Sequence, residues 1–334
     1  MSVVDKWALG PDVSRVGVID ERLRCRLADS LSYVAEMAGS DSLGQEQLDS
    51  LLQRLREASV SPWMFCLYSE LVAELVKKPR GDVKRCFNEV AVAAALQSEP
   101  SVVALGDPGI DEAWWRHFGV LLDTDPQQPF DPQPPEFRAF ASCKQDIRLG
   151  FELLRRGDAD FHTEVCRLLR MIVLGAPAPG SRGFNGASTF FLWGATLLNA
   201  NTKRSPVSLI DLVIHESSHV LLFGIAAEGP LLHNSSQERY ASPLRPDKRP
   251  IDGIFHACFV TTRVHLAMQR LLGSDAVRGD DAKEAAERGI RNGRASLASL
   301  ELLECHAVPT DLGARILGVI SAYWADASNR SSVA

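Results

Sequence analysis

The sequence lacks the features that mark several classes of protein. Its seven cysteines include no C-x-x-C pair, no eighteen apolar residues run without interruption, and no basic stretch followed by an apolar run stands at its start. Scattered cysteines are typical of reduced thiols in the cytosol, and the missing apolar signals argue against a membrane-spanning helix and a signal peptide. We therefore expect a cytoplasmic protein.

The sequence also lacks an excess of basic residues. It has 36 Lys and Arg against 42 Asp and Glu, which gives a formal net charge of -6 and a pI near 5.8. No block of five or six like charges suggests an interaction tail. Nucleic-acid-binding domains carry a basic footprint that is missing here, so we expect neither nucleic acid nor a membrane as a partner.

One stretch combines metal-ligand spacing with an apolar helical pattern. In SLIDLVIHESSHVLLF, residues 208–223, His215 and His219 are four apart, so a helix presents both imidazoles on one side. Nearly every other position is apolar, which predicts a buried helix that Gly224 ends. Burying two imidazoles and the carboxylate of Glu216 is costly unless a partner compensates them. We predict a divalent metal ion as that partner. The serines between the histidines are small and uncharged, which suits a buried helix and requires no further role.

A catalytic metal ion usually takes three protein ligands, so a third residue is needed from elsewhere in the chain. Leu222 and Ile225 stand where a metzincin needs glycine and histidine, which excludes that subclass. Glu238 lies nineteen residues beyond His219, loosely where thermolysin-like peptidases place their glutamate. The rival is His256, which lies in an apolar helical stretch preceded by arginines. The residues alone leave this choice open.

Hydrophobic periodicity predicts helices along most of the chain, and a length of 334 residues allows about two domains. The expected helices cover residues 20–37, a stretch capped by Asp41 and Ser42, a stretch opened by Ser61 and Pro62, and residues 82–96, 143–154, 161–174, 206–223, 251–272, 280–304 and 310–324. Residues 188–199 are rich in aromatic and β-branched types and predict one or two strands. The expected fold is mainly α with a small β component, with a helical N-terminal half and a metal-binding helical core.

Residues 123–136 separate the two halves of the chain. Their sequence, DTDPQQPFDPQPPE, contains five prolines and cannot hold a helix. We expect a loop or linker here. On this division, residues 1–122 form an N-terminal helical region that is a candidate for peptide or leader contact, and residues 137–334 form the metal-binding catalytic region.

The metal helix and the segment that follows it resemble a known family. HESSH, followed by YASPLRPDKRPIDGIFHACFV at residues 240–260 and preceded by a Gly/Ser/Phe-rich segment, is similar to the HExxH-motif peptide-modification proteins. These are also described as 2-oxoglutarate-dependent HExxH-type peptide β-hydroxylases. The resemblance extends over residues 60 to 272, and its strongest positions are His215, Glu216, His219, Arg245, Arg249, Pro250, Gly253 and His256.

The resemblance implies Fe(II), 2-oxoglutarate and O₂, with a ribosomally made precursor peptide that is hydroxylated on the β-carbon of a side chain. His256 then joins the histidine pair as third ligand, and Glu238 or Glu216 replaces it if a carboxylate is required. In this chemistry Glu216 orients a ligand or a substrate amide. Imidazoles suit iron as well as zinc, so the histidines do not decide between the metals.

A 2-oxoglutarate site needs a residue for the distal carboxylate. A planar guanidinium grips a carboxylate with two parallel hydrogen bonds, and the resemblance gives this role to Arg245 or Arg249. In the alternative interpretation these arginines are solvated or pair with Asp247 and Asp252.

Two other functions fit the same residues. One is a zinc metallopeptidase in which Glu216 acts as general base and Glu238 is the third ligand. The other is a non-enzymatic metal-stabilised protein that presents a peptide. Loss of metal binding on changing His256 or Glu238 distinguishes the oxygenase from the peptidase.

Overall fold

The protein is mainly α-helical with one small sheet, which confirms the expected fold class. The computed structural model describes residues 9–78, 80–96, 100–123, 129–181, 183–243 and 247–331. The helices are α1 (Val13–Ala38), η2 (Gly39–Asp41), α2 (Gln45–Glu57), α3 (Trp63–Val76), α4 (Val83–Ala95), α5 (Glu112–Leu122), α6 (Phe137–Gly157), α7 (Ala159–Leu168), η3 (Phe190–Leu192), α8 (Pro206–Ala226), α9 (Ile251–Leu272), α10 (Gly279–His306) and α11 (Asp311–Ser331). The strands are β1 (Ser101–Ala104), β2 (Pro132–Gln133), β3 (Met171–Pro177), β4 (Gly186–Ala187) and β5 (Ala195–Asn199).

The helix predicted over residues 161–174 is wrong in its second half. α7 ends at Leu168, and residues 171–177 form strand β3, in which all but Pro177 are buried. A short continuous apolar run fits a buried strand as well as a buried helix. Pairing with strands on both sides decides the outcome here, because β3 lies between β1 and β5.

Two predicted helix ends are also corrected. The cap of α2 is Gly44, because residues 39–41 form a separate 3-10 turn before it. Gly224 does not end α8, which continues to Ala226 and leaves Gly224 buried within the helix. The apolar packing of α8 therefore outweighs the helix-breaking tendency of a single glycine.

The chain forms two compact units, each built from separate stretches. Unit 1 contains the described residues within Met1–Arg15, Asp146–Val165 and Arg204–Ala334, and unit 2 contains those within Val16–Gln145 and Cys166–Lys203. The unit boundaries therefore differ from the borders after residues 122 and 136. Of the proline-rich segment, residues 124–128 lie outside the described residues. Division of the chain into 1–122, 123–136 and 137–334 by function stays a prediction.

Unit 2 holds the sheet and an aromatic core. The strand order is β1-β3-β5-β4, with β1, β3 and β5 parallel and β4 antiparallel, and β2 pairs with the end of β3. All five residues of β5 are buried, as expected for a strand of a parallel sheet covered on both faces. In the helical part, Trp63 contacts Trp114, Trp115 and Phe118 with ring centroids 4.9–5.7 Å apart.

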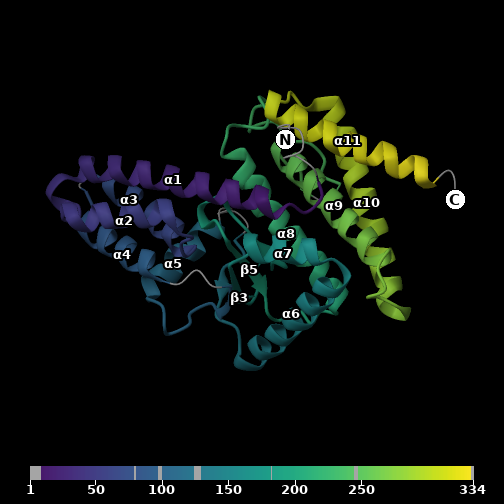
Figure 1. Ribbon diagram of the computed structural model, residues 1–334, viewed down its shortest axis with the longest axis horizontal. Coiled ribbons are helices and arrows are strands. Elements are labelled where there is room, and N and C mark those ends of the chain that lie inside the picture. Colours follow the sequence, from purple (N-terminus) through teal and green to yellow (C-terminus); the bar gives the residue numbers. More distant parts are fainter. Residues whose placement is uncertain are drawn as a thin grey trace. The chain divides into compact units, whose positions relative to one another are not determined.

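Unit 1 holds the predicted metal helix. α8 packs against α9 and α10 (Figure 1), and fourteen of its 21 residues are buried. Gly150 of α6 allows a close approach to this helix, because a Cβ atom there would lie 2.4 Å from a side-chain carbon of Leu209. By length and composition α8 is the one helix among the described residues that is apolar enough to cross a membrane. Its most apolar window is 72% buried inside the protein, as in a core helix.

Candidate metal centre

The start of α8 is fixed by a cap and a hydrogen bond to α10. The side chain of Ser205 accepts a hydrogen bond from the Ser208 amide, and Pro206 occupies the first turn, where its missing N–H costs nothing. The Ser205 hydroxyl also donates to Glu284 of α10 at 2.6 Å. These contacts set the position of the helix that carries both histidines.

α8 presents His215 and His219 on one face, as the spacing predicted. Both side chains are half-buried, their ring centroids lie 4.9 Å apart, and their Nε2 atoms lie 3.3 Å apart. Two nitrogens bound to one metal ion at about 2.1 Å lie about 3.0–3.4 Å apart for angles from octahedral to tetrahedral. The observed separation falls in this range, so this donor pair fits a single divalent metal ion.

His256 lies beside this pair on α9. Its ring stacks on that of His219 with centroids 5.7 Å apart and an interplanar angle of 21°, and it contacts Phe223 at 5.1 Å. Burial lowers the pKa of His256 below its ordinary value, although Asp252 raises it in part. A lowered pKa favours the neutral imidazole, which is the form that binds metal. Among the described residues, no hydrogen bond satisfies its ring nitrogens, unlike those of an ordinary core histidine.

The three histidines do not yet form a closed ligand set. Among the described residues, no choice of one ring nitrogen from each histidine places all three nitrogens within 4.8 Å of one another. The ring of His256 is stacked on that of His219, with centroids 5.7 Å apart. For His256 to become the third ligand, its imidazole must turn toward the pair.

The two glutamates of the prediction lie in opposite environments. Glu216 is 4% exposed and lies in α8 between the histidines. Glu238 is exposed on the segment after α8, where its carboxylate accepts a hydrogen bond of 2.6 Å from the hydroxyl of Tyr240. This bond raises the pKa of Tyr240. The carboxylate of Glu238 therefore already has a partner in solvent.

Arg249 is held directly before α9. Its backbone pairs with that of Tyr240 through two hydrogen bonds of 2.8 Å, and Pro250 then caps the helix. Its Nε lies 2.7 Å from Oδ2 of Asp247 without the angle of a hydrogen bond. Nε and Nη2 are both buried and have no hydrogen-bond partner in the part of the chain that the structure describes. The guanidinium group is thus ion-paired with Asp247 through Nε and keeps Nη2 as a buried donor that a carboxylate ligand could use.

Arg245, the other arginine predicted to hold a cosubstrate, lies outside the described residues. The alternative partners proposed for the arginines are partly present, because Asp247 forms the ion pair with Arg249. Arg249 lies two residues before the first residue of α9 and seven before His256.

Sequence reasoning missed a polar contact inside the histidine motif. The hydroxyl of Ser218 accepts a hydrogen bond of 3.0 Å from Nε of Arg263, which comes from α9. The interpretation that the two serines need no further role is therefore wrong for Ser218. An arginine in an otherwise apolar helical stretch was the available signal, since a buried cation requires partners.

Asp211 was also missed, although it stands four residues before His215. It is buried, and its Oδ2 accepts hydrogen bonds from Arg288 at 2.8 Å and from Arg291 at 2.5 Å, both on α10. The spacing Asp211, His215, His219 would have indicated it. Because two guanidinium groups already neutralise this carboxylate, it anchors α8 to α10 and is a poor metal ligand.

A second group of potential metal ligands lies in unit 2, on α3 and α4. It is the one group among the described residues in which three ligand atoms, from Glu70, Cys86 and Glu89, all lie within 4.8 Å of one another. Arg85 donates to Glu70 at 2.9 Å and to both oxygens of Glu89 at 2.7 and 2.8 Å. Burial raises the pKa of Cys86 to about 12, and the glutamates act in the same direction. The thiol is therefore protonated at neutral pH.

Comparison of the chain with known protein families finds no matching family, and comparison with curated proteins finds no match either. The functional argument consequently depends on the residues of the site and their geometry.

Proposed function

We propose that the protein is an Fe(II)- and 2-oxoglutarate-dependent dioxygenase that hydroxylates the β-carbon of a side chain in a ribosomally made precursor peptide. The observation that carries the proposal is the pair of imidazole nitrogens of His215 and His219, 3.3 Å apart on a buried helix. This separation suits two neighbouring positions on one metal ion. In this proposal the protein acts in the cytoplasm, with the peptide and O₂ as its partners.

Arg249 supports the oxygenase over a peptidase. A zinc peptidase needs a metal-bound water and a base, but no clamp for a small dicarboxylate. The buried Nη2 of Arg249 has no hydrogen-bond partner among the described residues and lies close to the start of the helix that carries His256, while Nε is paired with Asp247. Glu238, which the peptidase needs as third ligand, is exposed and bonded to Tyr240.

The residues of the chain have separate tasks in this mechanism. His215 and His219 would hold the metal ion with His256 as third ligand, and Arg249, with Arg245 as the second candidate, would hold the distal carboxylate of 2-oxoglutarate. Iron with 2-oxoglutarate and O₂ supplies the oxidation, in which one oxygen atom enters the peptide, the other enters succinate, and CO₂ leaves. Phe223, whose ring contacts those of His219 and His256, limits the access of water. Glu216 orients a ligand or a substrate amide from its buried position.

Anaerobic titration of the protein with Fe(II) and 2-oxoglutarate tests the proposal. We expect a weak visible charge-transfer band that appears only when both are present. Arg249→Ala should weaken 2-oxoglutarate binding about 10- to 100-fold, because a charge-assisted bidentate contact is lost. Arg239→Ala is the matched control, since Arg239 is an exposed arginine of the same segment that bonds only to backbone oxygens nearby. Absence of the band together with stoichiometric zinc would favour the peptidase.

A further inference from the structure

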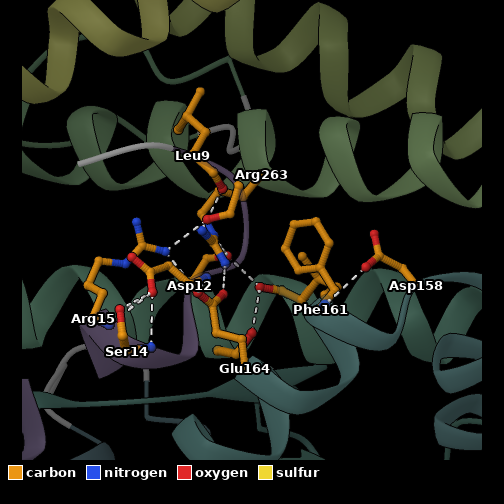
Figure 2. A network of polar contacts seen from close by, with 12 residues as sticks. Leu9, Asp12, Ser14, Arg15, Asp158, Phe161, Glu164 and Arg263 are labelled. Atoms are coloured by element: carbon orange, nitrogen blue, oxygen red, sulfur yellow. Dashed lines mark hydrogen bonds and ion pairs between the residues drawn. The ribbon is translucent and has the colours of Figure 1, made fainter. Parts of the chain in front are cut away.

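A buried polar network reaches the histidine motif from its far side. Figure 2 shows Arg263 of α9 at the centre of this network, with Leu9, Arg15 and Glu164 around it. The Arg263 side chain is fully buried and uses all three of its guanidinium nitrogens. Nε donates to Ser218, Nη1 donates to the Leu9 carbonyl at 2.6 Å, and Nη2 donates to Oε1 of Glu164.

Glu164 closes the network on its other side. Its Oε2 accepts hydrogen bonds of 2.8 Å from Nη2 of Arg15 and from the backbone amide of Asp12. Burial would raise the pKa of Asp12, but hydrogen bonds from Ser14 and Arg15 lower it below its ordinary value. Glu164 therefore faces the guanidinium groups of Arg263 and Arg15, and the charge of Arg15 also stabilises the Asp12 carboxylate.

The network is better suited to fixing a position than to adding stability. Moving ions from water into a protein interior costs about as much as their attraction returns, so buried ion pairs contribute little net stability. They do impose one arrangement, because any other leaves a charge without a partner. Here the arrangement joins four separate stretches of unit 1, namely the N-terminal segment, α7, α8 and α9.

Ser218 is the point at which this arrangement meets the histidines. It directly precedes His219, and its hydroxyl donates to the carbonyl of Ile214 at 2.6 Å, directly before His215. On α9, Arg263 follows His256 by seven residues, so both lie on the same face of that helix. The bond from Arg263 to Ser218 thus fixes the register in which the ring of His256 stacks on that of His219.

We infer that Arg263 is a positioning residue for the metal centre and acts through the hydroxyl of Ser218. This inference rests on the proposed function, because it requires a metal ion at His215 and His219. It assigns no chemical step to Arg263. Its effect is to hold α8 and α9 so that the ring of His256 lies beside the histidine pair, within reach of a shared ion once that ring turns, as outer-shell partners orient metal ligands in other metalloproteins.

The chain offers a matched control for this inference. Ser217 and Ser218 are neighbours in the same helix, both are fully buried, and both donate to the carbonyl of Ile214. Only Ser218 has a hydrogen bond with Arg263. Ser217→Ala and Ser218→Ala therefore remove the same group from fully buried positions that share one acceptor, and they differ in the contact with Arg263.

Anaerobic titration of the full-length protein with Co²⁺, followed by its visible absorption, tests the inference. We expect Ser218→Ala to raise the Kd for Co²⁺ about tenfold or more and to alter the shape of the absorption bands. Ser217→Ala should stay within about twofold of the unchanged protein, since outer-shell effects of 10- to 100-fold require a partner of the ligands. Thermal unfolding of both variants confirms that the titrations compare folded proteins.

A second variant checks that the effect passes from Arg263 through Ser218. Arg263→Lys keeps a positive charge beside Glu164 and removes the Nε donor, so it should weaken Co²⁺ binding as Ser218→Ala does. The double variant Ser218→Ala, Arg263→Lys should then bind Co²⁺ no more weakly than either single variant, because both substitutions remove the same interaction. Equal Kd values for Ser217→Ala and Ser218→Ala, with Tm lowered in both, would overturn the inference and leave the metal centre intact. Failure of the unchanged protein to bind Co²⁺ would instead overturn the proposed function.

Discussion

Two regions of the molecule gather side chains that bind metal ions in other proteins, and they differ in the type and the grouping of the donors. On α3 and α4, the trio Glu70, Cys86 and Glu89 is closely grouped, but Arg85 bonds to both carboxylates. On α8, only two nitrogens come together, 3.3 Å apart. A close grouping of ligand atoms is thus not by itself a sign of a metal site, because a cation of the protein can already neutralise the donors.

The comparison extends to protonation. Burial raises the pKa of the Cys86 thiol to about 12, so metal binding there must displace a proton as well as a guanidinium group. Burial lowers the pKa of His256, which leaves a neutral imidazole without a proton to displace. The same physical cause therefore opposes metal binding in one region and favours it in the other.

The largest expected effect is the loss of metal affinity on removal of one histidine of the pair. His215→Ala should weaken Fe(II) or Co²⁺ binding by about 100-fold or more, because loss of a ligand costs more than loss of an outer-shell partner. Cys86→Ser should leave the affinity and the stoichiometry of one ion per chain unchanged. Metal analysis after equilibrium dialysis measures both. Retention of the ion in His215→Ala with loss in Cys86→Ser would reverse the assignment of the two regions.

The second effect concerns the third ligand. His256→Ala should weaken metal binding about 10- to 100-fold, whereas Glu238→Ala should have little effect because Glu238 is exposed and bonded to Tyr240. Parallel titrations of the two variants with Co²⁺ make the comparison. The opposite order would move Glu238 into the metal centre and favour the peptidase.

Local sequence patterns were sufficient for the parts of this site that lie on one helix. The four-residue spacing of His215 and His219 predicted the face they share, and apolar periodicity predicted α9 from Ile251 to Leu272. The remaining contacts were not predicted because they join residues that are far apart along the chain. Arg263 and Glu164 are 99 residues apart, and Arg263 and Ser218 are 45 apart. No local periodicity reports a pairing over such separations.

Local sequence patterns were also insufficient to predict part of the sheet. Strand β3 was predicted as the end of a helix because its apolar run carries no clear period. Its neighbours β1 and β5 come from positions about 70 residues before and about 25 after it, and their pairing fixes its state. The pairing of β3 with its neighbours therefore determines that this run is a strand, which the run alone does not indicate.

A third prediction sharpens the comparison by removing the counter-charge from the second region. Arg85→Ala leaves Glu70 and Glu89 without their donor, so the free energy of unfolding should fall by about 1 kcal/mol for this partly exposed network. The same change should create a weak second site for Zn²⁺ or Cd²⁺. That site should disappear in the double variant Arg85→Ala, Cys86→Ser. Absence of a second equivalent in Arg85→Ala would show that geometry, and not Arg85, keeps this region from binding metal.

The smallest effect lies beside the same region, at His117. Burial lowers the pKa of His117, although Glu70 and Glu74 raise it in part, and its Nε2 lies 2.9 Å from the hydroxyl of Ser69. Because the pKa is lower in the folded state than the ordinary value of 6.5, folding favours the neutral ring. This contribution is present above pH 6.5 and is lost as the pH falls through the folded-state pKa. In the presence of a chelator, urea unfolding should therefore show a decline in stability from pH 7.5 to 5.5 that is smaller in His117→Gln. Part of the decline should remain, because burial also lowers the pKa values of His162 and His265. An equal decline in both proteins would mean that protonation of His117 costs the folded state nothing, and that the carboxylates of this region compensate it fully.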